Sequence, residues 1–500
     1  MAKFTPVEEI PGIVASTRES FSRGVTRPLS WRLEQLRGLR RMVEDNETLI
    51  CQALAKDLRR PKIEAQIFEV FDVFGHCILY EENLHRLAKK KVLPTPLLQR
   101  PVRTEVWKEP YGVVTVIAPW NYPIALLLIS VIGVIAAGNA CVMKPSEITE
   151  NCSALIAELI PKYLDSSAVR VVTGGVTETT VLLAQKVDFI AYTGNGSVGR
   201  IVAAAAAKHL TPVILELGGK CPVYIDESAN IPLAAKRIVW GKNFNAGQTC
   251  IAPDHVMVHE KVRDMFVEQL QEVRQEFYPG NEQENPDVSR IVNERHFKRI
   301  ESLLHGHGGK VLFGGTTNKD DRFVSFTVVT DPSLESDLMK EEIFGPVLPV
   351  MSVKSIEEAI SRVNGGPTPL ATYVFGRDKK ILTRWASEVP SGGTCVNDAI
   401  IHLSNPGGGL NGKGESGMGV TRGLEMFESF SHRKVVAFQS PDFDLAMKYP
   451  PYKEMPPLVK YLMVGIPSWV KHTLWGILAG VVVTICTCVA RHVSVKVTFH

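Results

Sequence analysis

The sequence predicts an α/β protein whose mostly parallel sheets are covered by helices. Short apolar runs typical of buried strands alternate with longer runs of helical periodicity, which is the pattern of βαβ units. Polar residues stand directly after several of these strands, at the edge of a parallel sheet where ligands bind. The length of 500 residues exceeds one ordinary hydrophobic core, so we expect two or three domains.

The first part of the chain has the pattern of helices. From Trp31 to Lys91, apolar residues recur three to seven positions apart among charged ones. The stretch Pro94–Pro101 ends this pattern. Two strands are expected next, an alternating one at Val102–Lys108 and a nearly all-apolar one at Gly112–Ile117.

Strands and helices then alternate along the chain. The expected strands are Val113–Ala118, Ala140–Lys144, Val169–Thr173, Asp188–Thr193 and Thr211–Glu216, and the expected helices are Pro123–Ala137, Asn151–Tyr163 and Ser197–His209. A second α/β stretch runs from Cys221 to about Val396. A glycine-dense segment, Pro406–Gly419, follows it.

The composition excludes several classes of protein. The net charge is only +3 and no dense basic stripe is present, so we expect no nucleic-acid partner. The nine cysteines form no CxxC pair and the 13 histidines show no ligand spacing. We therefore expect neither a metal site nor a disulfide framework.

The C-terminus has the composition of a membrane anchor. No acidic or strongly basic residue occurs from His472 to Ala490, and as a helix this run spans the ~30 Å hydrocarbon core of a bilayer. Trp469 and Arg491 flank the run, as interfacial anchors do. The proline-rich stretch Tyr449–Pro457 separates it from the preceding chain. This separation favours an anchor over a buried core helix or an amphipathic helix docked on the protein.

Several residues that follow strands could carry chemistry. Cys250 ends a loop of small residues, Asn245–Cys250, in which a thiol can be exposed as a nucleophile. Glu216 ends one strand, and Asn121 follows another. The alternatives are structural, because Asn121 could be a turn residue and Glu216 a cap.

Two further strand ends suggest a nucleotide site. Lys144 and Glu147 follow one strand, although they could equally form a surface salt bridge. Residues Gly194–Gly199 satisfy G-x-G-x-x-G between a strand and a helix, where a dinucleotide phosphate binds. The usual spacing rule would nominate Glu216 as the acid that holds the ribose.

Six motifs in one order resemble the aldehyde dehydrogenase superfamily over about residues 15–440. They are PWNYP, KPSE, TGNGSVG, ELGGK, GQTC and EEIFGP. The compact N-terminus, VWKEPYGVV, FSHRK and the tail resemble its class 3, or fatty aldehyde dehydrogenase, branch. This resemblance implies a Rossmann-like dinucleotide-binding domain, an α/β catalytic domain, a small β bridging or oligomerisation element and a C-terminal transmembrane helix.

The resemblance also implies a chemistry and a cofactor. Cys250 attacks the aldehyde as a thiolate, so its site must favour the anion; Asn121 and the Cys250 amide hold the oxyanion, and Glu216 activates the water that hydrolyses the thioester. The cofactor is NAD, with NADP possible. Its expected contacts are Lys144, Glu147, Gly194, Asn195, Gly196, Ser197, Val198, Gly199, Glu342 and Phe344.

The resemblance assigns domains and partners as well. The expected domains are dinucleotide-binding at 1–90 and 112–214, bridging at 91–111 and 397–440, catalytic at 215–396, a linker at 441–471, an anchor at 472–490 and a short tail at 491–500. We expect a homodimer that oxidises medium- or long-chain aliphatic aldehydes, with its catalytic domain facing the cytosol. The endoplasmic reticulum, the mitochondrial outer membrane and the peroxisome all suit a C-terminal anchor.

One segment departs from the family pattern. Family members usually carry a proline–aromatic–Gly-Gly loop before Ser416, whereas residues 405–414 contain no aromatic side chain. That loop normally walls the substrate entrance. Two other interpretations are a CoA-acylating dehydrogenase, against which Glu216 argues, and a membrane-tethered NAD-binding scaffold without activity.

Overall fold

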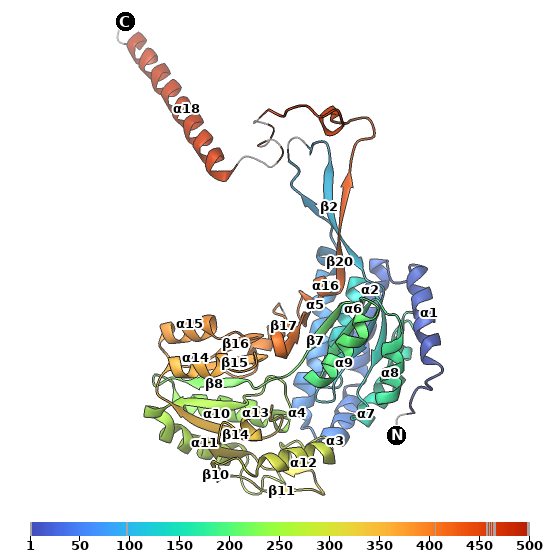
Figure 1. Cartoon of the computed structure of the whole chain (residues 1–500), viewed down its shortest axis with the longest axis vertical. Helices are drawn as coiled ribbons and strands as arrows, with labels where there is room; N and C mark the ends of the chain where they lie inside the picture. Colours follow the sequence, from blue (N-terminus) through green and yellow to red (C-terminus); the bar gives the residue numbers. More distant parts are fainter. Residues whose placement is uncertain are drawn as a thin grey trace. The chain divides into compact units, whose positions relative to one another are not determined.

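The computed structural model describes residues 3–96, 99–405, 407–456, 459, 461, 463 and 467–497 (Figure 1). Pro406 of the glycine-dense segment, Pro457 of the proline-rich stretch and residues 498–500 of the expected tail lie outside these residues. The chain forms two compact units, one of residues 1–88 and 109–432 and the other of residues 89–108 and 433–500. The functional domain boundaries given above stay a prediction.

The first unit contains a six-stranded sheet in the order β18-β7-β6-β3-β4-β5. Its strands are β3 (Val113–Ile117), β4 (Ala140–Lys144), β5 (Val169–Val171), β6 (Phe189–Thr193), β7 (Val213–Glu216) and β18 (Gly417–Met418). Five of them are parallel, and β18 is antiparallel to β7. The predicted parallel sheet is thus confirmed. Its strands are almost wholly buried, which explains their continuous apolar runs.

Helices cover this sheet (Figure 1). They are α1 (Ile10–Ser22), α2 (Leu29–Asp45), α3 (Glu47–Leu58), α4 (Lys62–Ala65), the π-helical turn η1 (Gln66–Val70), α5 (Phe71–Leu87), α6 (Ala125–Ala137), α7 (Glu150–Tyr163), α8 (Val176–Ala184) and α9 (Gly196–Ala207). Helix α6 is apolar on all sides because α2 and α5 pack against it and form one hydrophobic core with it. The helices predicted around Pro123–Ala137, Asn151–Tyr163 and Ser197–His209 are confirmed within a few residues.

A seven-stranded sheet in the same unit has the order β10-β13-β14-β9-β8-β15-β16. Its strands are β8 (Pro222–Ile225), β9 (His255–His259), β10 (Lys310–Phe313), β13 (Thr327–Thr330), β14 (Val347–Val353), β15 (Ala371–Phe375) and β16 (Gly393–Val396). All are parallel except β10. The accompanying helices are α10 (Ile231–Asn243), α11 (Arg263–Phe277), α12 (Glu294–Leu303), α13 (Asp337–Lys340), α14 (Ile356–Asn364) and α15 (Lys379–Glu388), and β11 (Thr317–Asn318) pairs with β12 (Phe323–Val324).

The glycine-dense segment returns the chain to the first sheet. In it, β17 (Leu410–Asn411) pairs with β19 (Val420–Thr421), and β18 lies between them in sequence. Gly417 of β18 stands opposite Glu216 of β7. Helix α16 (Met426–Ser429) then packs on α6. Residues 397–432, which include this segment, therefore belong to the first unit.

The second unit is built on a three-stranded sheet in the order β1-β2-β20. Its strands are β1 (Lys91–Leu93), β2 (Arg103–Pro110) and β20 (Ser431–Phe438). Helix α18 (Ser468–Val497) ends the described chain, and its segment Ser468–Thr487 is long and apolar enough to cross a membrane.

We predict that Gly417→Ala destabilises the protein. Gly417 has φ +132°, and a Cβ atom there would lie 1.9 Å from the carbonyl oxygen of Leu215. The strained backbone and the clash should together cost about 2 kcal/mol or more, and the apparent melting temperature should fall. Gly12→Ala in α1 is the matched control, because its Cβ would meet nothing within 4 Å. Equal melting temperatures for Gly417→Ala and the unchanged protein would contradict the prediction.

Candidate active site

The loop that carries Cys250 has an unusual backbone. After α10, the 3-10 turn η3 (Phe244–Gly247) holds Asn245 and Ala246 at φ +50° and +51°, and Gly247 follows at +73°. Side-chain-bearing residues rarely adopt this left-handed conformation. Three such residues in a row turn the chain sharply, so that Cys250 is partly exposed while Asn245 and Gln248 are buried.

The side chain of Gln248 fixes this loop. Its amide nitrogen donates to the carbonyl oxygens of Asn245, at 3.0 Å, and Arg290, at 2.9 Å. Its amide oxygen accepts from the Val292 amide at 3.0 Å. These contacts satisfy the buried amide group of Gln248, so the loop is held in one conformation.

Asn121, which follows β3, reaches the same loop. Its Nδ2 donates to the carbonyl oxygen of Gln248 at 3.1 Å, and its own carbonyl oxygen accepts from Asn245 Nδ2, also at 3.1 Å. The next residue is held too, because the hydroxyl groups of Tyr122 and Thr249 lie 2.7 Å apart. Asn121 and the residues just before Cys250 therefore form one buried network.

A buried ion pair supports Asn121 from behind. The Arg60 guanidinium donates both to the Glu69 carboxylate and to the carbonyl oxygen of Asn121. The second carboxylate oxygen of Glu69 accepts from the amides of Ile124 and Ala125, at 3.1 and 2.7 Å, at the start of α6. Burial raises the pKa of Glu69 to about 7, although Arg60 and the two amides act in the opposite direction. An unpaired charge at this depth would cost several kcal/mol, so the pair is held together tightly.

Cys250 and Glu216 line one cavity. Its remaining lining comes from Leu126, Ile129, Ser130, Thr193, Leu217, Leu410, Thr421 and Arg422. Glu216 is at the carboxyl end of β7 and is only 1% exposed. Leu410, which lies in the segment without an aromatic side chain, is part of the wall.

The surroundings of Cys250 raise the pKa of its thiol. Burial raises the pKa of Cys250 to about 12, and the nearby Glu342 and Glu216 carboxylates raise it further, whereas its own backbone amide and Arg422 act to lower it. The direction of this shift runs against the expectation that the site itself favours the thiolate, and the mechanism stays a prediction. Burial also raises the pKa of Glu216 well above its usual value, while Thr421, the Gly412 amide and Arg422 act to lower it. A carboxylate of raised pKa can accept a proton near neutral pH.

The candidate nucleotide residues stand at the carboxyl ends of neighbouring strands. Lys144 ends β4, is buried, and forms a 2.7 Å ion pair with Glu147. Asn195 follows β6 and caps α9, because its Oδ1 accepts from the Val198 amide at 2.9 Å and from the Ser197 hydroxyl at 2.7 Å. The Gly194–Gly199 motif thus begins a helix, as expected.

Glu342 and Phe344 lie in the loop before β14. The Glu342 carboxylate packs against Gly218, where a Cβ atom would lie 2.2 Å from its oxygen. Phe344, at φ +49°, contacts the ring of Trp120 edge-on, with ring centroids 5.3 Å apart. The loop thereby approaches both the Gly218 turn and the Asn121 segment. The Gly194 amide, in turn, donates to the carbonyl oxygen of Glu216 at 2.9 Å, which joins the glycine motif to a residue of the Cys250 cavity.

Sequence reasoning did not nominate the residues that support the site. Arg60, Glu69, Arg290 and Arg422 all act through partners far away in the sequence; Arg422 and Asp72, for example, are 350 positions apart. The one signal in the sequence that could have found them was that they are charged residues. An arginine or a glutamate inside an apolar helix pattern, as at Glu69, must be paired if it is buried.

Comparison with known proteins decides the family. A model of the aldehyde dehydrogenase family matches residues 4–436. The chain belongs to this family. It is 44% identical over 443 residues to "Aldehyde dehydrogenase family 3 member A2" of Rattus norvegicus, covering 88% of this chain and 91% of that protein. It is 41% identical over 448 residues to "Aldehyde dehydrogenase, dimeric NADP-preferring" of Canis lupus familiaris, covering 89% and 98%.

A solved structure agrees. The substrate-bound state of Staphylococcus aureus AldH superposes with a TM-score of 0.87 at 38% identity, covering 92% of this chain and 99% of that one. The predicted family and its class 3 branch are confirmed, as is the α/β fold. This aldehyde dehydrogenase uses NAD or NADP as its cofactor.

The strand ends are suited to such a cofactor. The first amides of α9 have no partner within the helix, and a Cβ atom at Gly196 would meet only the Arg200 guanidinium, at 3.2 Å. A phosphate can therefore approach this backbone closely. Lys144 places a buried ammonium group at the end of a neighbouring strand in the same sheet.

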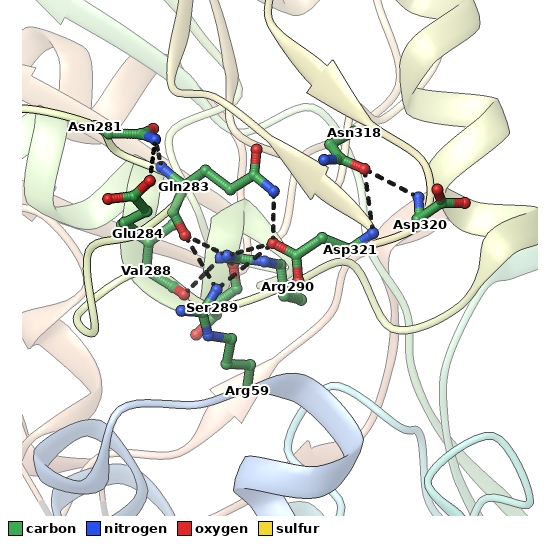
Figure 2. Close-up of polar contacts among 10 residues, drawn as sticks. All are labelled: Arg59, Asn281, Gln283, Glu284, Val288, Ser289, Arg290, Asn318, Asp320 and Asp321. Carbon is green, nitrogen blue, oxygen red and sulfur yellow. Dashed lines mark hydrogen bonds and ion pairs between the residues drawn. The ribbon is translucent and has the colours of Figure 1, made fainter.

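Arg290 extends the support of the Cys250 loop. Figure 2 shows the polar contacts of its guanidinium. Its guanidinium donates to Asp321 at 2.7 Å and to the carbonyl oxygens of Gln283, at 2.5 Å, and Val288, at 3.0 Å. Its backbone carbonyl accepts from Gln248. Arg59 reaches the same two partners from the surface, donating to the Gln283 carbonyl at 3.1 Å and lying 3.6 Å from Asp321.

We predict that Arg290→Met lowers both stability and activity. It removes the buried donors that hold the segment to which Gln248 is bonded, at a cost of about 3 kcal/mol. Thermal unfolding and aldehyde turnover measure the two effects. Arg59→Met is the matched control: its side chain is 41% exposed, so its loss should cost less than about 1 kcal/mol. If the two variants behave alike, Arg290 has no special part in supporting the loop.

Proposed function

We propose that the chain oxidises medium- and long-chain aliphatic aldehydes to carboxylic acids. The observation that carries this proposal is the single cavity shared by Cys250 and Glu216. Aliphatic side chains complete much of its lining: Leu126, Ile129, Leu217 and Leu410. An apolar wall around a few reactive polar groups favours a hydrocarbon chain that ends in one polar group.

In the proposed first step, the sulfur of Cys250 bonds to the aldehyde carbon. Because a raised pKa favours the protonated thiol, this proton must leave as the bond forms, and Glu216 in the same cavity is the acceptor. Asn121 Nδ2 uses one hydrogen on Gln248, so its second hydrogen is left for the developing oxyanion. The Cys250 amide is the other donor, and the loss of one such donor typically lowers turnover ~10²–10³-fold.

In the second half of the reaction, water releases the acid. The bound cofactor supplies the acceptor for the hydrogen that leaves the aldehyde carbon with its electron pair, and Cys250 is then acylated as a thioester. Once Glu216 has released the first proton to solvent, it takes a proton from water, which attacks the thioester carbon. The departing Cys250 sulfur then takes this proton back from Glu216 and becomes a thiol again. General-base assistance of this kind is worth ~10²–10⁴ in rate.

We propose that residues of both sheets would hold the cofactor. Lys144 and Glu147 would hold the adenosine ribose, Gly194–Gly199 would bind the pyrophosphate, and Glu342 and Phe344 would position the nicotinamide ribose. The Glu147 carboxylate opposes an additional phosphate on that ribose, which favours NAD over NADP. A relative named "NADP-preferring" supports the use of both.

We also propose that α18 anchors the enzyme in a membrane with its catalytic part in the cytosol. A bilayer concentrates apolar aldehydes next to the site, which supports fatty substrates. The membrane is that of the endoplasmic reticulum, the mitochondrial outer membrane or the peroxisome. A relative named "dimeric" supports a homodimer, in which residues 91–111 and 397–440 bridge the subunits.

The substrate test compares three aldehydes. Detergent-solubilised protein should reduce NAD faster with hexadecanal than with hexanal or benzaldehyde, as followed by NADH absorbance. Cys250→Ala should abolish turnover with all three, because no nucleophile remains. Protein that binds NAD and oxidises none of them would be a tethered binding protein. Faster turnover with benzaldehyde would contradict the fatty substrate while leaving the aldehyde chemistry intact.

The anchor test removes α18. The full chain should stay with vesicles of neutral phospholipid after an alkaline wash, whereas a chain ending before Ser468 should be released, because the exposed apolar segment is gone. Soluble hexanal should be oxidised equally by both. Retention of the shortened chain on the vesicles would show that another surface binds the membrane.

A further inference from the structure

Arg422 occupies a strained position beside the reactive cavity. It directly follows β19 and has φ +71°, in the left-handed region that side-chain-bearing residues rarely adopt. Such a conformation costs of order 1 kcal/mol and persists where surrounding contacts enforce it, often at functional sites. Neither Arg422 nor its partners were nominated by the motifs of the sequence.

Helix α5 enforces this position. Arg422 Nη2 donates to both carboxylate oxygens of Asp72, each at 2.7 Å, and the Tyr80 hydroxyl donates to the carbonyl oxygen of Gly423 at 2.8 Å. His76, one turn along α5, places its Nδ1 3.2 Å from Asp72. The side chain of Arg422 is only 10% exposed, so its charge acts in a medium of low polarity.

The charged groups around the cavity differ in sign. Arg422 lines the cavity together with Glu216 of β7 and Cys250 of the Cys250 loop. Asp72 and His76 face Arg422 from α5, and Glu342 acts on Cys250 from the loop before β14. Among the described residues that line the cavity, Arg422 alone carries a positive charge. Its charge opposes the effect of burial on the pKa values of Cys250 and Glu216 alike.

We propose that Arg422 is a positioning residue of this active site, held by Asp72 so that its charge stabilises the anionic forms of Cys250 and Glu216. The inference rests on the proposed function, in which these two groups exchange a proton. The thiol must become a thiolate to attack, and Glu216 must be ionised to accept a proton. A fixed cation beside both groups favours these forms in the buried cavity without taking part in any bond.

The reactivity of the Cys250 thiol tests the proposal without any turnover. The full chain in detergent, free of aldehyde and cofactor, is treated with iodoacetamide at one mildly alkaline pH, and alkylation of the Cys250 peptide is followed by mass spectrometry. Arg422→Gln should slow this reaction about three- to tenfold, because a rise of about one pKa unit reduces the thiolate fraction tenfold while the remaining thiolate is somewhat more nucleophilic. Arg422→Lys, which keeps the charge, should restore most of the rate.

Two further variants guard against indirect effects. Arg362→Gln removes an exposed arginine that pairs with Glu358 on α14, and it should leave the rate unchanged. If Arg422→Gln fails to fold because Asp72 is left unpaired, the double variant Arg422→Gln/Asp72→Asn removes both charges. It should also react more slowly than the unchanged protein, by a smaller factor.

The outcomes separate charge from structure and from the proposed function. Equal alkylation rates in Arg422→Gln and the unchanged protein, or a rate in Arg422→Lys as slow as in Arg422→Gln, would overturn the proposal. In an active enzyme, the acidic limb of the pH profile of kcat should also move to higher pH in Arg422→Gln, because Glu216 would lose its proton at a higher pH. Alkylation that responds to Arg422 in a protein that oxidises no aldehyde would uphold the electrostatic effect and reject the proposed function.

Discussion

The candidate active site depends on a buried carboxylate, Glu69, that does not line its cavity. Glu69 binds Arg60 with one oxygen and the first amides of α6 with the other. Arg60 in turn holds the carbonyl oxygen of Asn121, whose side chain is bonded to the loop before Cys250. This chain of contacts fixes three elements relative to one another: the start of α6, the end of β3 in the first sheet and the Cys250 loop beside the second sheet. A buried network of this kind tolerates little change, because each member left unpaired keeps its full cost of desolvation.

The second constraint is the edge of the sheet. Parallel strands end at the same side, so Asn121, Lys144, Asn195 and Glu216 emerge from β3, β4, β6 and β7 without any special arrangement. The chain returns to this sheet only near residue 417, where β18 adds an antiparallel strand beside β7. This return brings Thr421 and Arg422 to the cavity. The first sheet therefore carries Asn121 and Glu216, the loop before β9 carries Cys250, and the segment after Asn397 closes the cavity.

The pattern of apolar residues was sufficient to predict the parallel strands. A strand that is buried on both faces appears in the sequence as a short, continuous run of apolar residues. This pattern located Val113–Ala118 and Ala140–Lys144 within one residue of β3 and β4. It could not find β18, whose two residues, Gly417 and Met418, have no strand pattern and pair only because a glycine fits against Leu215. The shift in the pKa of Cys250 was likewise beyond it, because this pKa depends on burial and on charges at Glu342, Glu216 and Arg422, which are not neighbours of Cys250 in the sequence. The anchor was predicted at 472–490, whereas α18 begins at Ser468 and continues to Val497, since nothing around Arg491 breaks a helix.

The pairing of Gly417 with Glu216 also sets an order of events during synthesis. About two hundred residues separate Glu216 from β18, the strand that pairs with it. Most of both sheets can therefore be synthesised and packed before this side of the cavity is present. The apolar helix α18 begins about fifty residues after β18. At a typical ~5–20 residues per second, only a few seconds of translation lie between them. The chain thus completes the walls of this cavity and its apolar helix α18 within a short interval of synthesis.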